Sequence, residues 1–228
     1  MRPAHRPAIT LATLLLGMGV LGSLVVAQIR GGKALGIYLI DVEGGNATLF
    51  VTPSGESLLI DTGNGGAAAA RDADRIMAAV KDAGIAQIDH LITTHYHGDH
   101  FGAMAELVSR IAIRNFIDHG PNVQPNPNTD AFLEKTYPEL YAKARHTVVK
   151  PGDRVSMTSL DVRVLTSAGE AIKTPLPGAG APNPLCAAFK PQDVDKTENA
   201  QSVGSLITFG RFRTLHLGAL TVNKELDI

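Results

Sequence analysis

The segment His95-Tyr96-His97-Gly98-Asp99-His100 constrains the fold more than any other feature of this chain. It places three imidazoles and a carboxylate in one short run, directly after the apolar pair Leu91-Ile92. Such groups are costly to bury unless they are paired or bind a metal, and they are the usual ligands of zinc and related divalent ions. The segment therefore predicts a metal site at the end of a strand. The alternative is that these histidines only pack in the core or face solvent.

Alternation along an extended strand predicts how these side chains are arranged. If residues 91–94 form a strand and the extended backbone continues, His95, His97 and Asp99 project to one side with a period of two. His100 falls where the chain turns, so it can point at a second position. The four donors therefore serve either one ion or two.

The first 27 residues have the composition of an export signal. Two arginines precede an apolar run over residues 8–26, and Ala27 is a small residue before a cleavage point at Gln28. This pattern predicts a secretory signal peptide at residues 1–27, hence a periplasmic or secreted protein with no stable membrane partner. The alternative is an uncleaved N-terminal membrane anchor, because the run is nearly long enough to span a bilayer.

Charge and cysteine content narrow the possible partners. Residues 1–27 contain Arg2 and Arg6 and no acid, so the rest of the chain has 19 basic and 22 acidic residues, a net charge of −3. It contains no run of lysine or arginine, so we expect no binding of long duplex nucleic acid. The single cysteine, Cys186, excludes an internal disulfide and any cysteine-rich zinc site. Nothing in the sequence specifies an oligomeric state.

Hydrophobic periodicity and turn residues predict the order of elements. We expect strands at residues 36–42, 47–52, 57–61, 88–94, 111–118, 148–150, 154–165, 202–209 and 211–217, and helices at residues 67–83, 101–110 and 129–145. Pro53-Ser54-Gly55 predicts a hairpin, Gly84 ends the first helix, and Pro138 bends or interrupts the last. The proline-rich residues 167–199 are expected to form a functional or mobile loop. Strands occur in runs as well as alternating with helices, which indicates an α/β fold with mixed, α+β-like sheets.

The HxHxDH segment, together with Ile60-Asp61-Thr62-Gly63, resembles the metallo-β-lactamase superfamily. The stretches IDVEGGNATLFVTPSGESLLIDTGNG and ENAQSVGSLITFGRFRTLHLGAL are similar to exported hydrolases related to the nuclease-like domain of DNA-uptake competence proteins. The likeness covers the chain from Gly36 to its end. It implies an αββα sandwich of two mixed sheets covered by helices, with the metal site at the sheet edge.

The resemblance also implies roles for individual residues. His95 and His97 would hold the first metal ion, and Asp99 and His100 the second. Asp99 would also orient or deprotonate the attacking water, which makes it the candidate catalytic residue. Asp61 would steady the loop that carries the ligands, and a turn-capping aspartate is an equal interpretation of this residue. The implied cofactor is one or two divalent ions, with zinc first and manganese or iron as alternatives.

Two regions depart from the pattern of the family. The family places a metal-bridging aspartate in a Gly-Asp-Leu stretch, and the matching residues here are Gly218-Ala219-Leu220. The family also expects further ligand histidines, yet Asn199 and Ser202 occupy the middle ligand region and no histidine follows His216. We therefore expect a fragment that lacks the last part of the second sheet. The alternative is a catalytically impaired protein that keeps the scaffold.

Several other residues can be interpreted either as structural residues or as functional ones. Asp118-His119 either lines the opening of the predicted metal site or forms a simple turn pair. Residues 43–46 either approach the site or form only a tight turn. His216 could substitute for the missing aspartate, but it lies three residues before Ala219, on the opposite side of a strand, so we expect it to pack or to face solvent. Cys186 is expected to pack, because no basic residue or histidine stands beside it.

These features together predict a metal-dependent hydrolase that uses a metal-activated water. The competence-type resemblance implies a small-molecule or short phosphodiester, or another ester, as the substrate. A β-lactam or lactone ring is the alternative substrate class. The alternative function is a binding or scaffold protein in which Ala219 prevents turnover.

Overall fold

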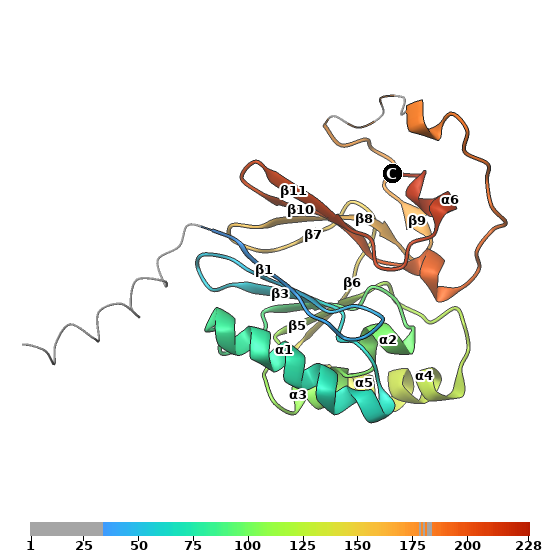
Figure 1. Cartoon of the computed structure of the whole chain (residues 1–228). Helices are drawn as coiled ribbons and strands as arrows, with labels where there is room; N and C mark the ends of the chain where they lie inside the picture. Colours follow the sequence, from blue (N-terminus) through green and yellow to red (C-terminus); the bar gives the residue numbers. More distant parts are fainter. Residues whose placement is uncertain (1–33, 178, 180, 182–183) are drawn as a thin grey trace, which may run out of the picture. The chain divides into compact units, whose positions relative to one another are not determined.

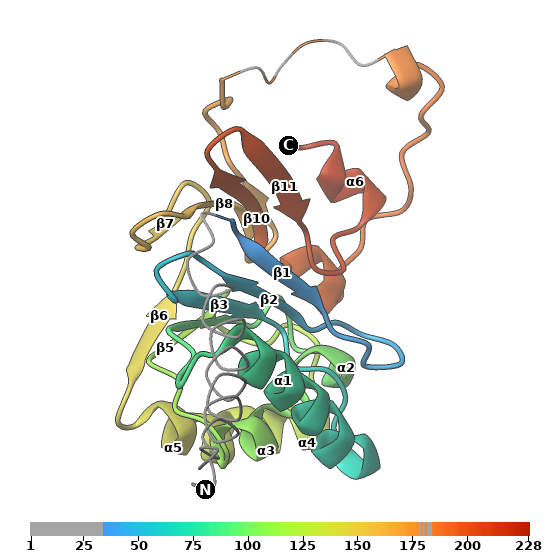
Figure 2. The ribbon, with the colours of Figure 1, turned by 60° about the vertical axis from the view of Figure 1, so that its left-hand side comes forward.

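Two β-sheets form the centre of the fold, and helices cover the free face of the first sheet (Figures 1 and 2). The computed structural model describes residues 34–177, 179, 181 and 184–228. The signal peptide predicted at residues 1–27 lies outside these described residues. Residues 34–228 form one compact unit.

The first sheet has six strands and carries the predicted metal motif. Its strands are β1 (Gly36–Leu39), β2 (Thr48–Val51), β3 (Ser57–Ile60), β4 (His90–Ile92), β5 (Asn115–Asp118) and β6 (Arg145–Val148), in this spatial order. The first three strands pair antiparallel, and β3 to β6 pair parallel. The prediction of a mixed sheet is therefore confirmed, as is the hairpin between β2 and β3.

The second sheet is antiparallel and comes from the C-terminal half. It consists of β7 (Arg154–Val155), β8 (Asp161–Ser167), β9 (Glu170–Ala171), β10 (Gly204–Phe209) and β11 (Phe212–His216). The main order is β11-β10-β8-β7, with β9 paired to β8. The pair β10 and β11 turns at Gly210, as its sequence predicts.

The helices follow the predicted positions but are more divided. They are α1 (Ala69–Ala83), α2 (Gly98–Phe101), α3 (Met104–Val108), α4 (Pro127–Ala131), α5 (Tyr137–Tyr141) and α6 (Val222–Glu225). Short 3-10 turns are η2 (Gly66–Ala68), η4 (Pro184–Cys186) and η5 (Glu198–Gln201), and η3 (Phe132–Thr136) is a π-helical turn. The helix predicted at residues 129–145 continues without a gap through α4, η3 and α5 but ends at Tyr141, since β6 begins at Arg145. The π-helical turn η3 precedes Pro138, which cannot donate the backbone hydrogen bond of a regular α-helix.

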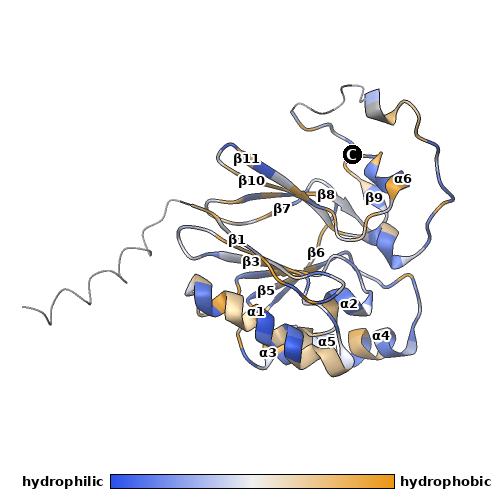
Figure 3. Cartoon of the chain, in the orientation of Figure 1, coloured by the Kyte–Doolittle hydropathy of each residue, from blue (hydrophilic) through white to orange (hydrophobic). Residues whose placement is uncertain are grey.

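Helix α1 shows why these residues form a helix and where it ends. Ala73, Ile76 and Val80 lie on one face and are buried, whereas the other face is polar (Figure 3). Burying a side chain the size of Ile76 stabilises the fold by about 1.5–3 kcal/mol. Gly84 ends the helix in the left-handed conformation, with φ +67°.

Two apolar cores separate the layers. Alternate residues of β2 divide between them, since Leu49 packs with the helices and Phe50 packs between the sheets. Val162 and Ile207 of the second sheet belong to the core between the sheets. The order of layers is thus helices, first sheet, second sheet, and the described residues add only the short α6 beyond the second sheet. Within the described part of the chain, no helix has the length and apolar character needed to span a membrane.

Candidate metal centre

The predicted metal motif lies where the parallel strands of the first sheet end. Strand β4 ends at Ile92, and residues 93–97 continue as a loop. The neighbouring parallel strand β3 ends just before Asp61. Carboxyl ends of parallel strands lie at the same sheet edge, which brings Asp61 beside the histidine loop.

The backbone changes from extended to helical inside the motif. Helix α2 begins at Gly98, so Asp99 and His100 lie on a helical turn. The expected alternation with a period of two is therefore wrong for Asp99. His95 and His97 do lie side by side, with their ring centroids 4.8 Å apart.

Close backbone packing holds this turn in place. Gly45 has φ +69°, and a Cβ atom on it would lie 1.8 Å from the carbonyl oxygen of Asp99. The same oxygen accepts a hydrogen bond of 3.2 Å from the backbone N–H of Asn46. The glycine-rich residues 43–46 therefore do approach the site and are more than a tight turn. Gly98 differs, because a Cβ atom there would meet no atom within 4 Å.

Asp61 is a buried carboxylate that binds three parts of the site. Its Oδ1 accepts a hydrogen bond of 2.7 Å from the backbone N–H of Thr94, and its Oδ2 accepts one of 2.8 Å from the Thr94 hydroxyl. The same Oδ2 lies 2.7 Å from Nδ1 of His100. Burial alone would raise the pKa of Asp61, but the hydrogen bonds and charge of His100 and the N–H of Thr94 outweigh it and lower this pKa. Asp61 is therefore ionised and can only accept hydrogen bonds.

This acceptor fixes which nitrogen of His100 and His95 carries a proton. His100 donates through Nδ1 to Asp61, so in its neutral form Nε2 holds the free lone pair. The Thr94 hydroxyl has given its hydrogen to Asp61, so it can only accept from Nδ1 of His95, which lies 3.1 Å away. Nε2 of His95 is then the unprotonated nitrogen.

A different acceptor determines which nitrogen of His97 carries a proton. Nε2 of His97 lies 3.0 Å from Oε1 of Gln124. The orientation of that amide follows from its second contact, since Oε1 also accepts a hydrogen bond of 3.2 Å from the backbone N–H of Glu198. His97 must therefore donate through Nε2, so that in its neutral form Nδ1 is the unprotonated nitrogen.

The two unprotonated nitrogens face each other. Nε2 of His95 and Nδ1 of His97 are 3.1 Å apart. Two lone pairs at this distance repel unless a cation lies between them, and burial together with the charges of His100 and His97 lowers the pKa of His95 to about 4. Two nitrogens that share a tetrahedral zinc ion at bonds of about 2.0–2.1 Å lie roughly 3.3 Å apart. The pair therefore fits a divalent metal in chemistry, orientation and spacing.

The remaining predicted ligands lie next to this pair without completing it. The rings of His95 and His100 are 4.1 Å apart, and Nε2 of His100 is 3.9 Å from the carboxylate of Asp99, whose side chain is about half exposed. Among the described residues, no group of three or more histidine, cysteine, aspartate or glutamate side chains is arranged to hold a metal ion. The structure thus provides two neighbouring pairs of donors.

An open groove of about 450 Å³ borders the second pair. Its lining includes Asp99, His100, Asn46, His216 and Ala219. Gly218 and Ala219 of the Gly-Ala-Leu stretch therefore border the same groove as Asp99 and His100.

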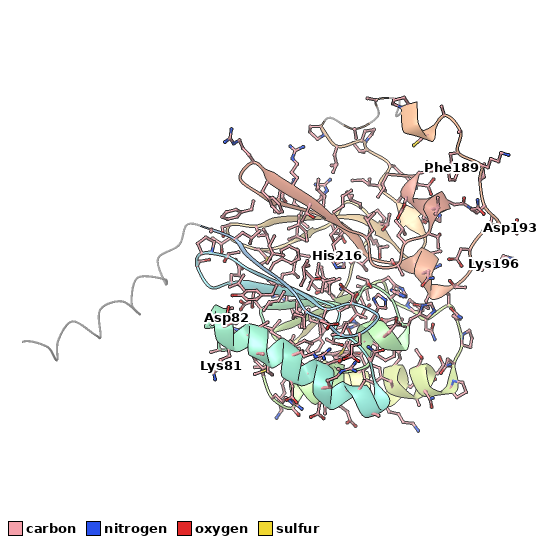
Figure 4. The ribbon with its side chains drawn as sticks, viewed as in Figure 1. Lys81, Asp82, Phe189, Asp193, Lys196 and His216 are labelled. Carbon is pink, nitrogen blue, oxygen red and sulfur yellow. The ribbon has the colours of Figure 1, made fainter. Side chains whose placement is uncertain are left out.

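His216 lies on the inner face of β11, between the two sheets (Figure 4). Its Nε2 is 3.2 Å from the amide nitrogen of Asn46, and burial lowers its pKa. The expectation that His216 packs or faces solvent is incomplete, because this residue also borders the groove.

The other polar candidates have structural partners. Asp118 accepts hydrogen bonds from Tyr137 at 2.8 Å and from His146 at 2.7 Å, so it ties β5 to α5 and β6. His119 is buried against Glu198, with Nε2 2.9 Å from the carboxylate. Asp118-His119 is therefore a pair of anchoring residues. Cys186 is exposed, so the expectation that it packs is wrong.

Of three further residues that contact the site, Gln124 and Glu198 had no signal in the sequence, whereas Asn46 belongs to the glycine-rich segment 43–46 that was predicted as one that could approach the site. Gln124 lies in a loop, Glu198 begins η5 after the long proline-rich segment, and Asn46 lies in a glycine-rich turn. Asn46 donates to the carbonyl of Ile60 at 2.9 Å and lies 3.3 Å from Asp61. Their roles depend on contacts between distant segments, which no local spacing records.

Comparison with known families agrees with this fold. The profile of the metallo-beta-lactamase superfamily matches residues 40–180. The chain belongs to this superfamily, whose members are metal-dependent hydrolases. A comparison with curated proteins finds no match.

Several solved structures are similar to this chain at low identity. A metallo-β-lactamase of Cronobacter sakazakii (HARLDQ motif mutant S60) is 13% identical, with a TM-score of 0.48, over 79% of this chain and 58% of that one. MEM-A1, a subclass B3 metallo-β-lactamase from a soil metagenome library, is 17% identical, with a TM-score of 0.46, over 78% and 58%. CmlA, a diiron β-hydroxylase from Streptomyces venezuelae, is 18% identical, with a TM-score of 0.43, over 81% and 29%. The matched region thus spans less than two thirds of each of these proteins.

Proposed function

We propose that this chain is an exported metal-dependent hydrolase that acts on a short phosphodiester or another ester. The observation that supports it is the facing pair of unprotonated nitrogens on His95 and His97, 3.1 Å apart. Each of these imidazoles is held through its other nitrogen, by Thr94 and by Gln124. This arrangement orients ligands toward a metal before the metal binds.

Each residue of the site would have its own role. When bound, a divalent ion supplies Lewis acidity and lowers the pKa of a coordinated water. His95 and His97 would hold one ion, with zinc favoured and manganese or iron open, and His100 with Asp99 would add donors toward the groove. Asp99, whose side chain is half exposed at the groove, would accept a proton from an attacking water. Asp61 keeps His100 and Thr94 in position.

A second candidate function is a binding or scaffold protein without turnover. Ala219 favours it, because this groove residue has no donor where the family carries a bridging aspartate. A fold shared by many chemistries does not decide between these functions.

Metal analysis combined with turnover separates the two candidates. The purified chain is loaded with zinc, dialysed, and assayed for bound metal and for hydrolysis of a chromogenic phosphodiester, a chromogenic ester and a chromogenic β-lactam. Bound metal with phosphodiester or ester turnover supports the proposal, and β-lactam turnover alone would identify the alternative substrate class. Metal-free protein without turnover, indistinguishable from His95→Ala, would reject the hydrolase.

Ala219→Asp tests the position of the missing carboxylate. We expect higher zinc occupancy in this variant, because the new carboxylate enters the groove beside Asp99 and His100. Ala219→Asn, which has nearly the same shape without the charge, is the control. Equal occupancy in Ala219→Asp and the unmodified chain would show that residue 219 does not correspond to the bridging position.

A further inference from the structure

Glu198 is a buried residue whose carboxylate has three hydrogen-bond partners. Its side chain is about 1% exposed. The carboxylate accepts hydrogen bonds from the backbone N–H of Tyr96 at 2.9 Å and of Val123 at 2.7 Å, and lies 2.9 Å from Nε2 of His119. Burial raises the pKa of Glu198, but these donors outweigh it and lower the pKa. An ionised carboxylate therefore occupies the junction between the histidine loop and the C-terminal half.

The partners of Glu198 stand on both sides of His97. Tyr96 immediately precedes His97 in the histidine loop. Val123 immediately precedes Gln124, whose Oε1 lies 3.0 Å from Nε2 of His97. The backbone N–H of Glu198 itself donates to that same Oε1. One residue thus holds both the backbone that carries His97 and the amide that contacts its ring.

We propose that Glu198 is a positioning residue for His97, acting through the Tyr96 backbone and through Gln124. It keeps the imidazole in the tautomer that presents Nδ1 to a divalent metal ion. This assignment rests on the proposed function for the use of the metal, but its effect on the ring is a property of the metal-free protein. Partners of this kind commonly change metal affinity about tenfold or more.

The chemistry of the carboxylate makes the assignment testable. Glu198→Gln keeps the size of the side chain but replaces one acceptor oxygen with an NH2 group, so one of the two backbone N–H groups loses its acceptor. Gln124→Ala removes the acceptor of His97 and leaves the buried carboxylate in place. Gln124 is exposed, so this second variant is not expected to unfold the protein.

The first measurement is the tautomer of His97. Two-bond proton–nitrogen NMR spectra of the metal-free, full-length chain should show His97 protonated at Nε2 alone. Gln124→Ala and Glu198→Gln should each populate both tautomers. A wild-type His97 that already populates both tautomers, or variants with the wild-type tautomer, would overturn the assignment.

The second measurement is zinc affinity, from competition with a chelating dye. We expect a loss of about tenfold in each variant. The matched control is Asp72→Asn, which alters another buried carboxylate that accepts a backbone N–H, from Asn64 at 2.7 Å, but has no hydrogen bond to the histidine loop. An equal loss in this control would assign the effect to general destabilisation and overturn the proposal. Absence of zinc binding in the wild type would instead reject the proposed function, and the NMR spectra would still decide the role of Glu198.

Discussion

The two sheets contribute to the candidate site in unequal ways. The first sheet supplies every predicted donor, because His95, His97, Asp99 and His100 all follow strand β4. It also supplies Asp61, which fixes their orientation. The second sheet and the loop before it supply contacts to these residues: Glu198 binds the Tyr96 backbone, and the backbone N–H of Val203 donates to the Thr94 carbonyl at 2.8 Å.

The first sheet thus carries the metal-binding side chains, and the second sheet contacts the loop that holds them. Donors are close together in the sequence, so a single strand end can deliver them. The supports Glu198 and Val203 lie about a hundred residues further along the chain, so their contacts form only when the two sheets pack together. Variants in the two regions should therefore differ in how strongly they affect metal binding.

The largest effect is expected for Asp61→Ala. This change leaves the Thr94 N–H and Nδ1 of His100 without a buried acceptor, so we expect a loss of about 3–5 kcal/mol in the free energy of unfolding. Zinc binding should also be lost. Urea unfolding and metal content after dialysis measure the two effects. Asp61→Asn, which tolerates φ +62° and keeps one acceptor, should lose less. Normal zinc content in Asp61→Ala would contradict the role of the first sheet.

A smaller effect is expected for Gly218→Ala, on the side of the second sheet. A Cβ atom at Gly218 would lie 2.7 Å from Cβ of Thr94, and φ is +61°. We expect a loss of about 1–3 kcal/mol in the free energy of unfolding and weaker zinc binding. The control is Gly210→Ala, with φ +58° but no atom within 4 Å of its Cβ. If both variants bind zinc equally, the second sheet does not support the ligands through Thr94.

The smallest effect is expected at the far edge of the first sheet, where His146 pairs with Asp118. The hydrogen bond to Asp118 raises the pKa of His146 despite partial burial. The stabilisation by this pair is therefore fully present below the unfolded pKa of about 6.5 and is lost as the pH rises through the higher folded value. Because His146 is partly exposed, we expect no more than about 1 kcal/mol.

Urea unfolding of the wild type and His146→Gln from pH 5.5 to 9 measures this effect. The stability difference between the two proteins should shrink as the pH rises, with zinc affinity unchanged. A difference that grows with pH would reject the pair as a stabilising contact, and a loss of zinc affinity would show that the site depends on the whole first sheet.

The sequence specifies the first half of the fold well. Gly84 and the periodic residues Ile76 and Val80 define α1, and Pro53-Ser54-Gly55 defines the hairpin of β2 and β3, because local chemistry decides both. Strand lengths are less predictable. Strand β4 ends at Ile92 instead of Thr94, since the Thr94 backbone N–H bonds to the Asp61 side chain and not to a neighbouring strand.

The site could be predicted only in part for the same reason. The spacing of the HxHxDH segment identifies the donors, but the helical turn at Asp99 depends on the close approach of Gly45 from a distant loop. Gln124 and Glu198 could not be found, because each acts through a single long-range hydrogen bond to the histidine loop. A glutamate in a proline-rich loop has no periodic pattern that would distinguish it from a solvated residue.

The open space at Gly98 has a consequence for altering the protein. This position lies inside the motif, yet a side chain there would meet no atom and would suit the first turn of α2. Diversifying residue 98 would therefore change the rim of the site while leaving its scaffold intact. Residue 98 is therefore a suitable position for variants that probe the proposed hydrolase function.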